Sequence, residues 1–272
     1  MTPQQAHPTI AFIGGGNMAS ALIGGLVRSG AAPERIVVVE PFEAQRDKLA
    51  QAFGVIAQAT ADARLAAVAT VVWAVKPQLF AQAAAPCAAH IGNALQLSVM
   101  AGIRSEALVR ASGTERVVRA MPNTPALIGQ GIAGLYARAA VDKAARSEVE
   151  ALFAPTGASL WVAHEDDLDA VTALSGSGPA YVFYFLEAMM QAAAEMGLTE
   201  SQGRLMAQST FAGAAALAQQ SPLSPAALRE QVTSKGGTTA AAIASLDASG
   251  VKAAFVKALH AARDRAGELG RA

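Results

Sequence analysis

Two glycine-rich segments contain residue types that can bind small charged molecules. The first is "GGGNMA", which gives the pattern Gly14-x-Gly16-x-x-Ala19 directly after the apolar run "TIAFI". Glycines let the backbone turn tightly and approach a pyrophosphate, and the N-terminus of the helix that follows attracts negative charge. This segment predicts dinucleotide binding. The alternative is an ordinary glycine turn before a helix.

The second segment is "VTSKGGTT" at 232–239, which interrupts a C-terminal half otherwise rich in alanine. Gly236 and Gly237 permit backbone conformations in which successive N–H groups converge. One helix-terminus contact contributes only about 0.3–1 kcal/mol, so several must act together. We predict a receptor for a small anion, above all a carboxylate. The alternative is a helix start capped by Thr238 or Thr239.

Further candidates follow the apolar runs that we interpret as strands. Glu40 ends the second run, where an acidic side chain can accept hydrogen bonds from the adenine ribose. The pairs Lys76-Pro77 and Ala101-Gly102 follow two later runs, and Asn123-Thr124 lies between two prolines in a turn. Open α/β sheets bind ligands at the carboxyl ends of strands, so we expect these residues near the cofactor. Solvated strand ends and a purely structural turn are the alternatives.

The predicted secondary structure changes along the chain. Short apolar runs rich in β-branched residues predict strands at 9–13, 36–40, 70–75, 95–99, 116–120, 132–136 and 158–162. Continuous apolar runs are typical of strands that are covered on both faces. Their alternation with helical segments predicts a mainly parallel, doubly wound sheet.

From about residue 169 the pattern is helical. Helices are predicted near 178–196, 200–219, 224–231, 239–247 and 250–269. We therefore predict an α/β protein in which a Rossmann-type dinucleotide-binding domain, 1–168, precedes an all-α domain, 169–272. The small side chains of these helices bury little area each, so we expect them to pack against a second copy, as a homodimer at least.

Composition excludes several other classes of protein. The 272 residues have zero net charge and only 15% charged residues, so no basic face for nucleic acid is expected. No run reaches about 18 apolar residues, and the N-terminus lacks a signal-peptide pattern. A single cysteine and four scattered histidines predict neither a disulfide nor a metal site. We expect a cytoplasmic protein.

Five segments together resemble the pyrroline-5-carboxylate reductase family. They are "FIGGGNMASALIGGL", "AVKPQ", "MPNTPA", "LSGSGPAYVF" and "VTSKGGTTAAAI", in that family's order and spacing. The resemblance covers nearly the whole chain, and the last two segments are the most specific. It implies a Rossmann domain, a helical domain that forms intertwined dimers, often assembled into decamers, and NAD(P)H-dependent reduction of 1-pyrroline-5-carboxylate to L-proline.

The resemblance also implies the site residues. Those along the cofactor pyrophosphate would be Ile13, Gly14, Gly15, Gly16, Asn17 and Met18. Those flanking the ribose and nicotinamide would be Ala74, Val75, Lys76, Pro77, Met100, Ala101 and Gly102. Those holding the substrate carboxylate would be Ser234, Lys235, Gly236, Gly237, Thr238 and Thr239. Glu165 would lie near bound proline, and the Thr239 hydroxyl near the ring nitrogen.

Two positions depart from the family's pattern. Glu40 stands where NADPH-preferring members often have a small hydroxyl residue, so we expect NADH to be used at least as well as NADPH. Gln231 stands where an asparagine often lies beside the cofactor. A pyrroline nitrogen that arrives protonated is already an electrophile and the cofactor supplies the hydride, so Thr239 is the only catalytic residue expected, as hydrogen-bond partner or proton donor.

Two other functions fit parts of the chain. A β-hydroxyacid dehydrogenase also pairs a Rossmann domain with a helical one and resembles the "GSGP" region. It needs a lysine on the following helix, however, and no lysine occurs between Lys143 and Lys235. A dinucleotide-sensing binding protein without turnover would share the glycine fingerprint, and only the intact "TSKGGTT" segment argues against it.

Overall fold

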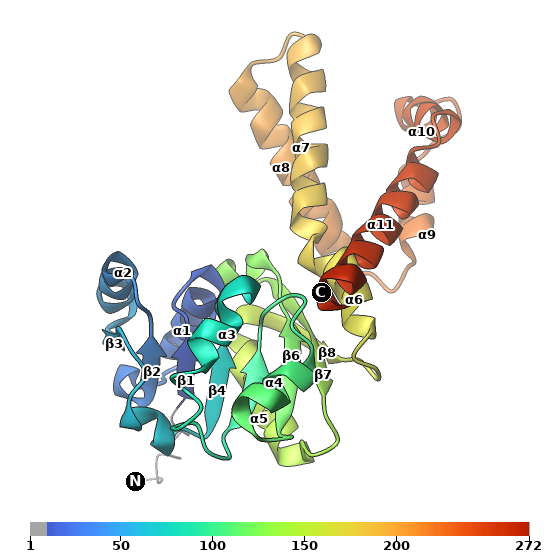
Figure 1. Ribbon diagram of the computed structural model, residues 1–272. Helices are drawn as coiled ribbons and strands as arrows, with labels where there is room; N and C mark the ends of the chain where they lie inside the picture. The colour runs from blue at the N-terminus through green and yellow to red at the C-terminus, as the bar shows by residue number, and fades with distance from the viewer. Residues whose placement is uncertain (1–9, 272) are drawn as a thin grey trace. The chain divides into compact units, whose positions relative to one another are not determined.

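The computed structural model describes residues 10–271, and a twisted sheet forms the centre of its N-terminal part (Figure 1). Among the described residues the sheet has eight strands in the order β3-β2-β1-β4-β5-β6-β7-β8. They are β1 Ile10–Ile13, β2 Ile36–Val39, β3 Ala57–Gln58, β4 Thr70–Trp73, β5 Leu95–Ser98, β6 Val117–Met121, β7 Gly131–Ala137 and β8 Gly157–Trp161. Neighbouring strands are parallel except β6 and β7.

The strand order reverses between β1 and β4. The chain winds outward from β1 through β2 to β3, then returns to place β4 on the other side of β1, followed by β5 and β6. A sheet wound in this way leaves a crevice at the carboxyl ends of the two central strands, because the connecting helices diverge there. The predicted Rossmann-type fold class is thus confirmed.

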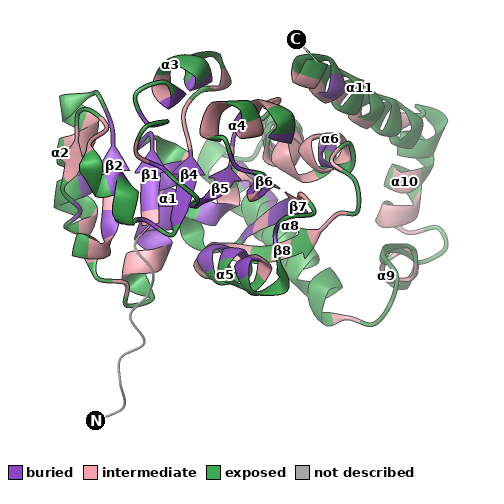
Figure 2. Ribbon diagram, turned by 60° about the horizontal axis from the view of Figure 1, so that its bottom comes forward, coloured by how far each residue is buried: buried purple, intermediate pink, exposed green. Residues whose placement is uncertain are grey.

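Helices cover both faces of the sheet. In the first unit of the chain they are α1 Asn17–Arg28, α2 Glu43–Phe53, α3 Phe80–Ala84, α4 Ser105–Ser112, α5 Lys143–Phe153 and α6 Asp167–Val171. Short 3-10 helices lie at Pro33–Arg35, Ala63–Ala67, Pro77–Leu79, Thr124–Ile128 and Ala154–Thr156, and a π-helix lies at Thr172–Gly176. The strands are therefore enclosed, and Figure 2 shows them buried beneath partly exposed helices.

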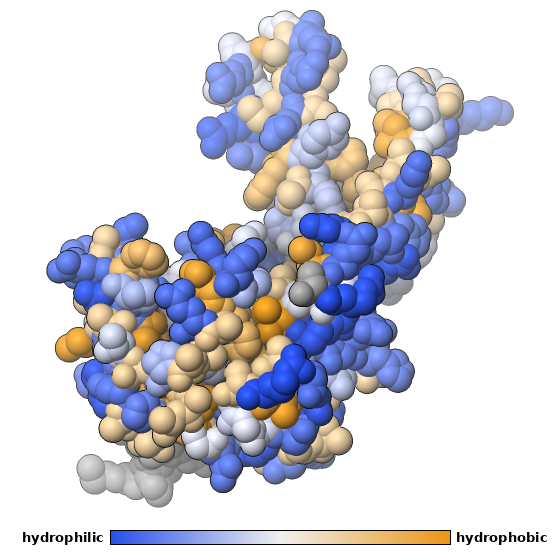
Figure 3. All heavy atoms as spheres, in the orientation of Figure 1, coloured by the Kyte–Doolittle hydropathy of each residue, from blue (hydrophilic) through white to orange (hydrophobic). Residues whose placement is uncertain are grey.

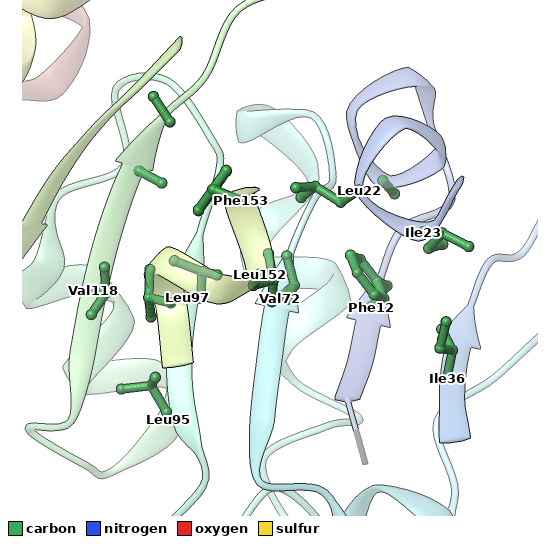
Figure 4. Close-up of a cluster of buried hydrophobic side chains, with 14 of the residues drawn as sticks. Phe12, Leu22, Ile23, Ile36, Val72, Leu95, Leu97, Val118, Leu152 and Phe153 are labelled. Atoms are coloured by element: carbon green, nitrogen blue, oxygen red, sulfur yellow. The ribbon is translucent and has the colours of Figure 1, made fainter. Parts of the chain in front are cut away.

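Two apolar cores result, one on each face. On one face Phe12 and Val72 of the strands point toward Leu22 of α1 and Phe153 of α5 (Figure 4). On the other face Trp73 packs in a core with residues of α3 and α4. Every residue of β4, "TVVW", is buried, which is why its sequence reads as a continuous apolar run.

The second unit, 178–261, consists of helices. They are α7 Gly178–Glu195, α8 Glu200–Gln220, α9 Pro225–Gln231, α10 Thr238–Ala248 and α11 Val251–Arg271, the end of which belongs to the first unit. A capping box between Thr199 and Gln202 begins α8. Tyr181 and Phe185 of α7 pack edge-on against Phe255 of α11, each pair with ring centroids 5.7 Å apart.

Large apolar side chains lie at the surface of this helical unit. Phe183 is 58% exposed, Tyr184 70% and Met196 74%. Figure 3 shows apolar side chains on the outer surface of these helices. A unit that leaves this much apolar area in water gains little from its own burial, so its stability depends on a further apolar surface.

In residues 10–271 no single helix is both long and apolar enough to cross a membrane. Helices α10 and α11, taken together as a bent pair, have the length and composition of a membrane span.

The sequence predicted most elements and missed one strand. All seven predicted strands are present, with ends shifted by at most two residues, and the predicted helices of the second unit are present. Strand β3 was missed because it has only two residues. The contacts divide the chain after Ser177 and join 262–272 to the first unit, whereas the boundary predicted from the sequence lies after residue 168.

Candidate functional site

The glycine-rich segment forms a tight turn at the carboxyl end of β1. Gly14 has a φ of +97°, and a Cβ there would lie 2.7 Å from the carbonyl oxygen of Ala74. The N–H of Gly14 donates to Val39, and that of Ala74 donates to Ile13, both at 2.8 Å. Glycine is therefore required by the backbone conformation and by the close approach of β4. At Gly16 a Cβ would meet no atom within 4 Å, and the residue is exposed.

The side chain of Glu40 is hydrogen-bonded to this turn. Its carboxylate accepts hydrogen bonds from the N–H of Gly15 at 2.8 Å and the N–H of Phe42 at 2.9 Å, and the residue is only 6% exposed. Gln45 donates to the carbonyl oxygen of Gly15 at 2.5 Å. The sequence did not show this structural use of Glu40. Each carboxylate oxygen can accept a second hydrogen bond, so a ribose hydroxyl can still bind there.

The first turn of α1 has no side-chain cap. The N-cap residue is Gly16, no side chain accepts from the first-turn amides, and the turn contains no acidic residue. Asn17 is exposed and Met18 is half-buried. The positive end of the helix dipole and its free N–H groups suit a phosphate, so this turn fits a dinucleotide pyrophosphate.

A cavity of about 470 Å³ adjoins the glycine turn. It lies between the carboxyl ends of β1 and β2 and the segment after β4, with Gly14 and Val75 in its wall. Most of the lining is apolar, including Phe42, and Thr60 and Gln82 supply polar atoms. An apolar slot with a few polar atoms suits the adenosine part of a dinucleotide. Phe42, Thr60 and Gln82 could not be identified from the sequence, because no local pattern links these loops.

The other predicted cofactor residues lie at the same edge of the sheet. Strands β1, β4 and β5 are adjacent and parallel, so the segments Ala74–Pro77 and Met100–Gly102 follow neighbouring carboxyl ends. Lys76 is exposed and begins a 3-10 helix, and Met100 is buried. Gly102 has a φ of +75°, which explains the glycine at this position. The fold thus brings the glycine turn and both segments together.

Glu165 lies within a network of charged side chains in the first unit. Its Oε1 accepts from the N–H of Ser105 at 2.6 Å and from Arg119 at 2.9 Å, and its Oε2 accepts from the Ser105 hydroxyl at 2.7 Å. Burial alone raises the pKa of Glu165, but these hydrogen bonds and the charge of Arg119 outweigh it and lower the pKa below its ordinary value. Both oxygens of the Glu165 carboxylate are therefore hydrogen-bonded inside its own unit.

Asn123 joins three segments of the first unit. Its side chain donates to the carbonyl oxygen of Ser175 in the π-helix at 3.1 Å and accepts from the N–H of Ile132 in β7 at 2.9 Å. A Cβ on Gly176 would lie 2.5 Å from the terminal methyl carbon of Met121, so the Met121 side chain packs directly against the π-helix. These contacts support the structural interpretation of the "MPNTP" turn.

Residues 234–237 form a largely exposed turn before α10, and Thr238 and Thr239 begin that helix. Gly236 has a φ of +74°, and a Cβ on Gly237 would lie 2.6 Å from the hydroxyl oxygen of Ser234. Helix α10 begins at Thr238 with Gly237 as N-cap and without a side-chain cap. The alternative that Thr238 or Thr239 caps this helix is therefore wrong. Both threonines lie in a first turn whose amides receive no side-chain cap, an arrangement suited to a carboxylate. Lys235 and Thr238 are exposed, and Thr239 is half-buried.

Comparison with known proteins bears directly on these sites. Residues 9–102 match a family model described as NADP oxidoreductase, coenzyme F420-dependent, and residues 165–269 match one described as pyrroline-5-carboxylate reductase dimerisation. The pyrroline-5-carboxylate reductase of Pseudomonas aeruginosa is 44% identical over 96% of this chain and 97% of its own. That of Haemophilus influenzae is 40% identical over 97% and 98%.

The chain belongs to the pyrroline-5-carboxylate reductase family. Solved structures agree: a pyrroline-5-carboxylate reductase from Coxiella burnetii has a TM-score of 0.89 at 36% identity and covers 97% of this chain and 98% of its own. The Plasmodium falciparum pyrroline carboxylate reductase with NADP bound has a TM-score of 0.87 at 25% identity, covering 97% and 99%.

Membership of this family confirms several predictions. The predicted family and the class of NAD(P)H-dependent oxidoreductase are confirmed, and the helical unit lies within a dimerisation domain, which supports a homo-oligomer acting on a small molecule. In residues 10–271 no group of three or more His, Cys, Asp or Glu side chains is placed to hold a metal ion. The roles of individual site residues stay predictions.

Proposed function

We propose that this chain reduces the C=N bond of 1-pyrroline-5-carboxylate to give L-proline, the last step of proline biosynthesis, in the cytoplasm. The observation that carries the proposal is the near-complete coverage of relatives named pyrroline-5-carboxylate reductase at 34–44% identity. The uncapped glycine turn, which fits a dinucleotide, and the uncapped turn before α10, which fits a carboxylate, support it.

NAD(P)H supplies the hydride when it is bound. The residues that would hold its pyrophosphate are Ile13, Gly14, Gly15, Gly16, Asn17 and Met18 at the start of α1. The cavity lined by Phe42 and Thr60 would hold the adenosine part. The residues that would flank the ribose and nicotinamide are Ala74, Val75, Lys76, Pro77, Met100, Ala101 and Gly102.

The substrate carboxylate would bind at the start of α10. Backbone amides of the turn before α10 and the hydroxyls of Ser234 and Thr238 would hold it, with the Lys235 side chain adding positive charge. The Thr239 hydroxyl would then hydrogen-bond the ring nitrogen and hold or deliver a proton there. A nitrogen that is already protonated makes the C=N carbon electrophilic, so orientation and exclusion of water are what the protein must provide.

Glu165 has a different role in this proposal. Its carboxylate accepts three hydrogen bonds from Ser105 and Arg119. A carboxylate with these contacts is better suited to holding the start of α4 against β6 than to binding proline directly. We therefore assign the substrate contacts to Ser234–Thr239 and treat Glu165 as a supporting residue.

NADH is the preferred or equal cofactor in our proposal. The Glu40 carboxylate lies at the end of β2, the position that reads the adenine ribose, and its negative charge opposes a 2′-phosphate. Arg46 on α2 is the nearby cation in the sequence, and its guanidinium already donates to the carbonyl oxygens of Glu40 and Pro41 at 3.0 and 2.7 Å. These bonds would have to break for Arg46 to neutralise a phosphate.

Purified protein tests the reaction directly. NADH oxidation should depend on added pyrroline-5-carboxylate, and L-proline should form in an amount equal to the NADH consumed. A β-hydroxyacid dehydrogenase would instead reduce a β-keto acid, and a sensor would bind NADH without turnover. Binding of NADH with neither substrate reduced would therefore contradict the proposed enzyme and leave the dinucleotide site intact.

A further inference from the structure

The loop between β5 and α4, residues 99–104, follows the strand end that faces the second half of a dinucleotide. In a sheet wound outward from β1 and β4, the strands β1–β3 serve the adenosine half and the strands from β4 onward serve the other half. The adenosine cavity adjoins the glycine turn. The loop after β5 is therefore on the nicotinamide side, provided that the proposed function holds.

Arg104 ties this loop to a distant segment of the same unit. Its guanidinium donates to Asp166 at 2.6 Å and to Asp169 at 2.8 Å. The side chains of Arg104 and Asp169 are 20% and 15% exposed, so this ion pair is partly shielded from water. Arg104 is the N-cap residue of α4 but caps nothing with its side chain. Its hydrogen-bond partners are instead distant in the sequence. Charge-assisted hydrogen bonds of this kind are stronger than neutral ones.

The end of α11 lies directly on Arg104 and its partners. A Cβ on Gly270 would lie 2.7 Å from Nε of Arg104, and one on Gly267 would lie 3.4 Å from Oδ2 of Asp169. A Cβ on Gly102 would lie 3.3 Å from the carbonyl oxygen of Leu269. Glycine weakens a helix relative to alanine, so two glycines near the end of α11 call for a packing reason. Close contact with Arg104 provides that reason at Gly270, whereas the 3.4 Å distance at Gly267 is an ordinary van der Waals contact.

We propose that Arg104 is a positioning residue for the reaction, held between Asp166, Asp169 and the end of α11 so that the 99–104 loop keeps the shape the nicotinamide half requires. Arg104 touches neither cofactor nor substrate in this proposal. It acts through the loop, whose far end is fixed by the hydrogen bond from the N–H of Met100 to Ser98 at 3.2 Å.

Binding of two ligands to the full-length protein tests the proposal. ADP-ribose contains the adenosine and pyrophosphate parts of NADH but lacks nicotinamide. Arg104→Ala removes both charge-assisted hydrogen bonds and should weaken NADH binding about tenfold, while ADP-ribose binding stays within about twofold of wild type. Gly270→Ala keeps all charges but displaces the Arg104 side chain, so it should act in the same direction, and Arg104→Lys should recover part of the loss.

Matched variants separate this effect from general damage. Arg110→Ala removes an exposed arginine from the same helix, and Gly213→Ala adds a Cβ to α8 where no atom lies within 4 Å. Arg110→Ala should bind NADH and ADP-ribose as the wild type does, and Gly213→Ala, which lies in the helical unit, should keep the ratio of the two affinities. The proposal would be overturned if a folded Arg104→Ala or Gly270→Ala protein bound NADH with wild-type affinity. It would also be overturned if the affinities for NADH and ADP-ribose fell by the same factor. A wild type that binds neither ligand would instead refute the proposed function.

Discussion

At the level of single residues, the two proposed binding turns share one property: no side chain caps the backbone amides of the helix that follows. Gly16 and Gly237 are the N-cap residues of α1 and α10, and neither helix has a side-chain cap. A serine or aspartate at either position would satisfy the first-turn amides internally. In our proposal, glycine keeps these amides available to a phosphate in one unit and to a carboxylate in the other.

Thr239 is the residue whose removal should affect substrate but not cofactor. Thr239→Ala should lower turnover and weaken binding of proline-like carboxylates by about tenfold or less, since one neutral hydrogen bond contributes about 0.5–1.5 kcal/mol. NADH affinity should stay unchanged. Steady-state kinetics and proline inhibition measure this, with Ser245→Ala, an exposed hydroxyl of the same helix, as control. A far larger fall in turnover would indicate proton donation, and no change would remove Thr239 from the site.

Glu40 should set the choice between the two cofactors. Two unit charges about 4 Å apart interact by roughly 4 kcal/mol at an effective dielectric near 20, before salt and rearrangement reduce it. Glu40→Ser should therefore raise catalytic efficiency with NADPH relative to NADH. The same change leaves the N–H of Gly15 without its acceptor, so affinity for both cofactors should fall.

Catalytic efficiencies with NADH and NADPH, measured for wild type and variant, test the role of Glu40. Glu43→Ser, an exposed carboxylate at the start of α2, is the control and should leave the ratio unchanged. A wild type that strongly prefers NADPH would contradict the prediction.

At the scale of elements, a charged network connects α4, β6 and the segment between β8 and α6. Glu165 accepts hydrogen bonds from Ser105 at the start of α4 and from Arg119 in β6. Arg119 is only 5% exposed. Removing one partner of such a buried pair is costly, because the other charge stays behind without compensation. The network therefore fixes where α4 begins.

Stability should fall in acid partly because of Glu165. Its pKa in the folded protein lies below the ordinary value of 4.5, so its contribution is fully present above that value and is lost as the pH falls through the folded pKa. Thermal unfolding measured as a function of pH should show this loss. In Glu165→Gln the melting temperature should be lower at neutral pH and should depend less on pH in the acid range. An unchanged pH profile in that variant would contradict the assignment.

At the scale of the whole molecule, the exposed apolar surface of the helical unit calls for a partner. Phe183 and Tyr184 on α7 are more than half exposed. A homodimer would bury such side chains, as the match to a dimerisation domain indicates.

A charge placed on α7 should disrupt that assembly. Wild-type protein should sediment as a dimer or larger species at micromolar concentration, and Tyr184→Glu should shift it toward monomer because burying an unpaired carboxylate is costly. Ile56→Glu, at a position 81% exposed in the first unit, should sediment as wild type does. A wild-type monomer with full activity would show that the apolar surface serves another purpose.

Local sequence patterns were sufficient to predict seven of the eight described strands, the helices of the second unit, the glycine turn and the turn before α10. These features depend on local physics: apolar runs for buried strands, and glycines where a positive φ or a close backbone approach is needed, as at Gly14 and Gly236. Only the tertiary structure revealed that Glu40 supports the turn, that Glu165 binds Ser105 and that α11 ends against Arg104. Those contacts join residues far apart in the chain, and no local pattern encodes which distant charges will meet once the sheet has formed.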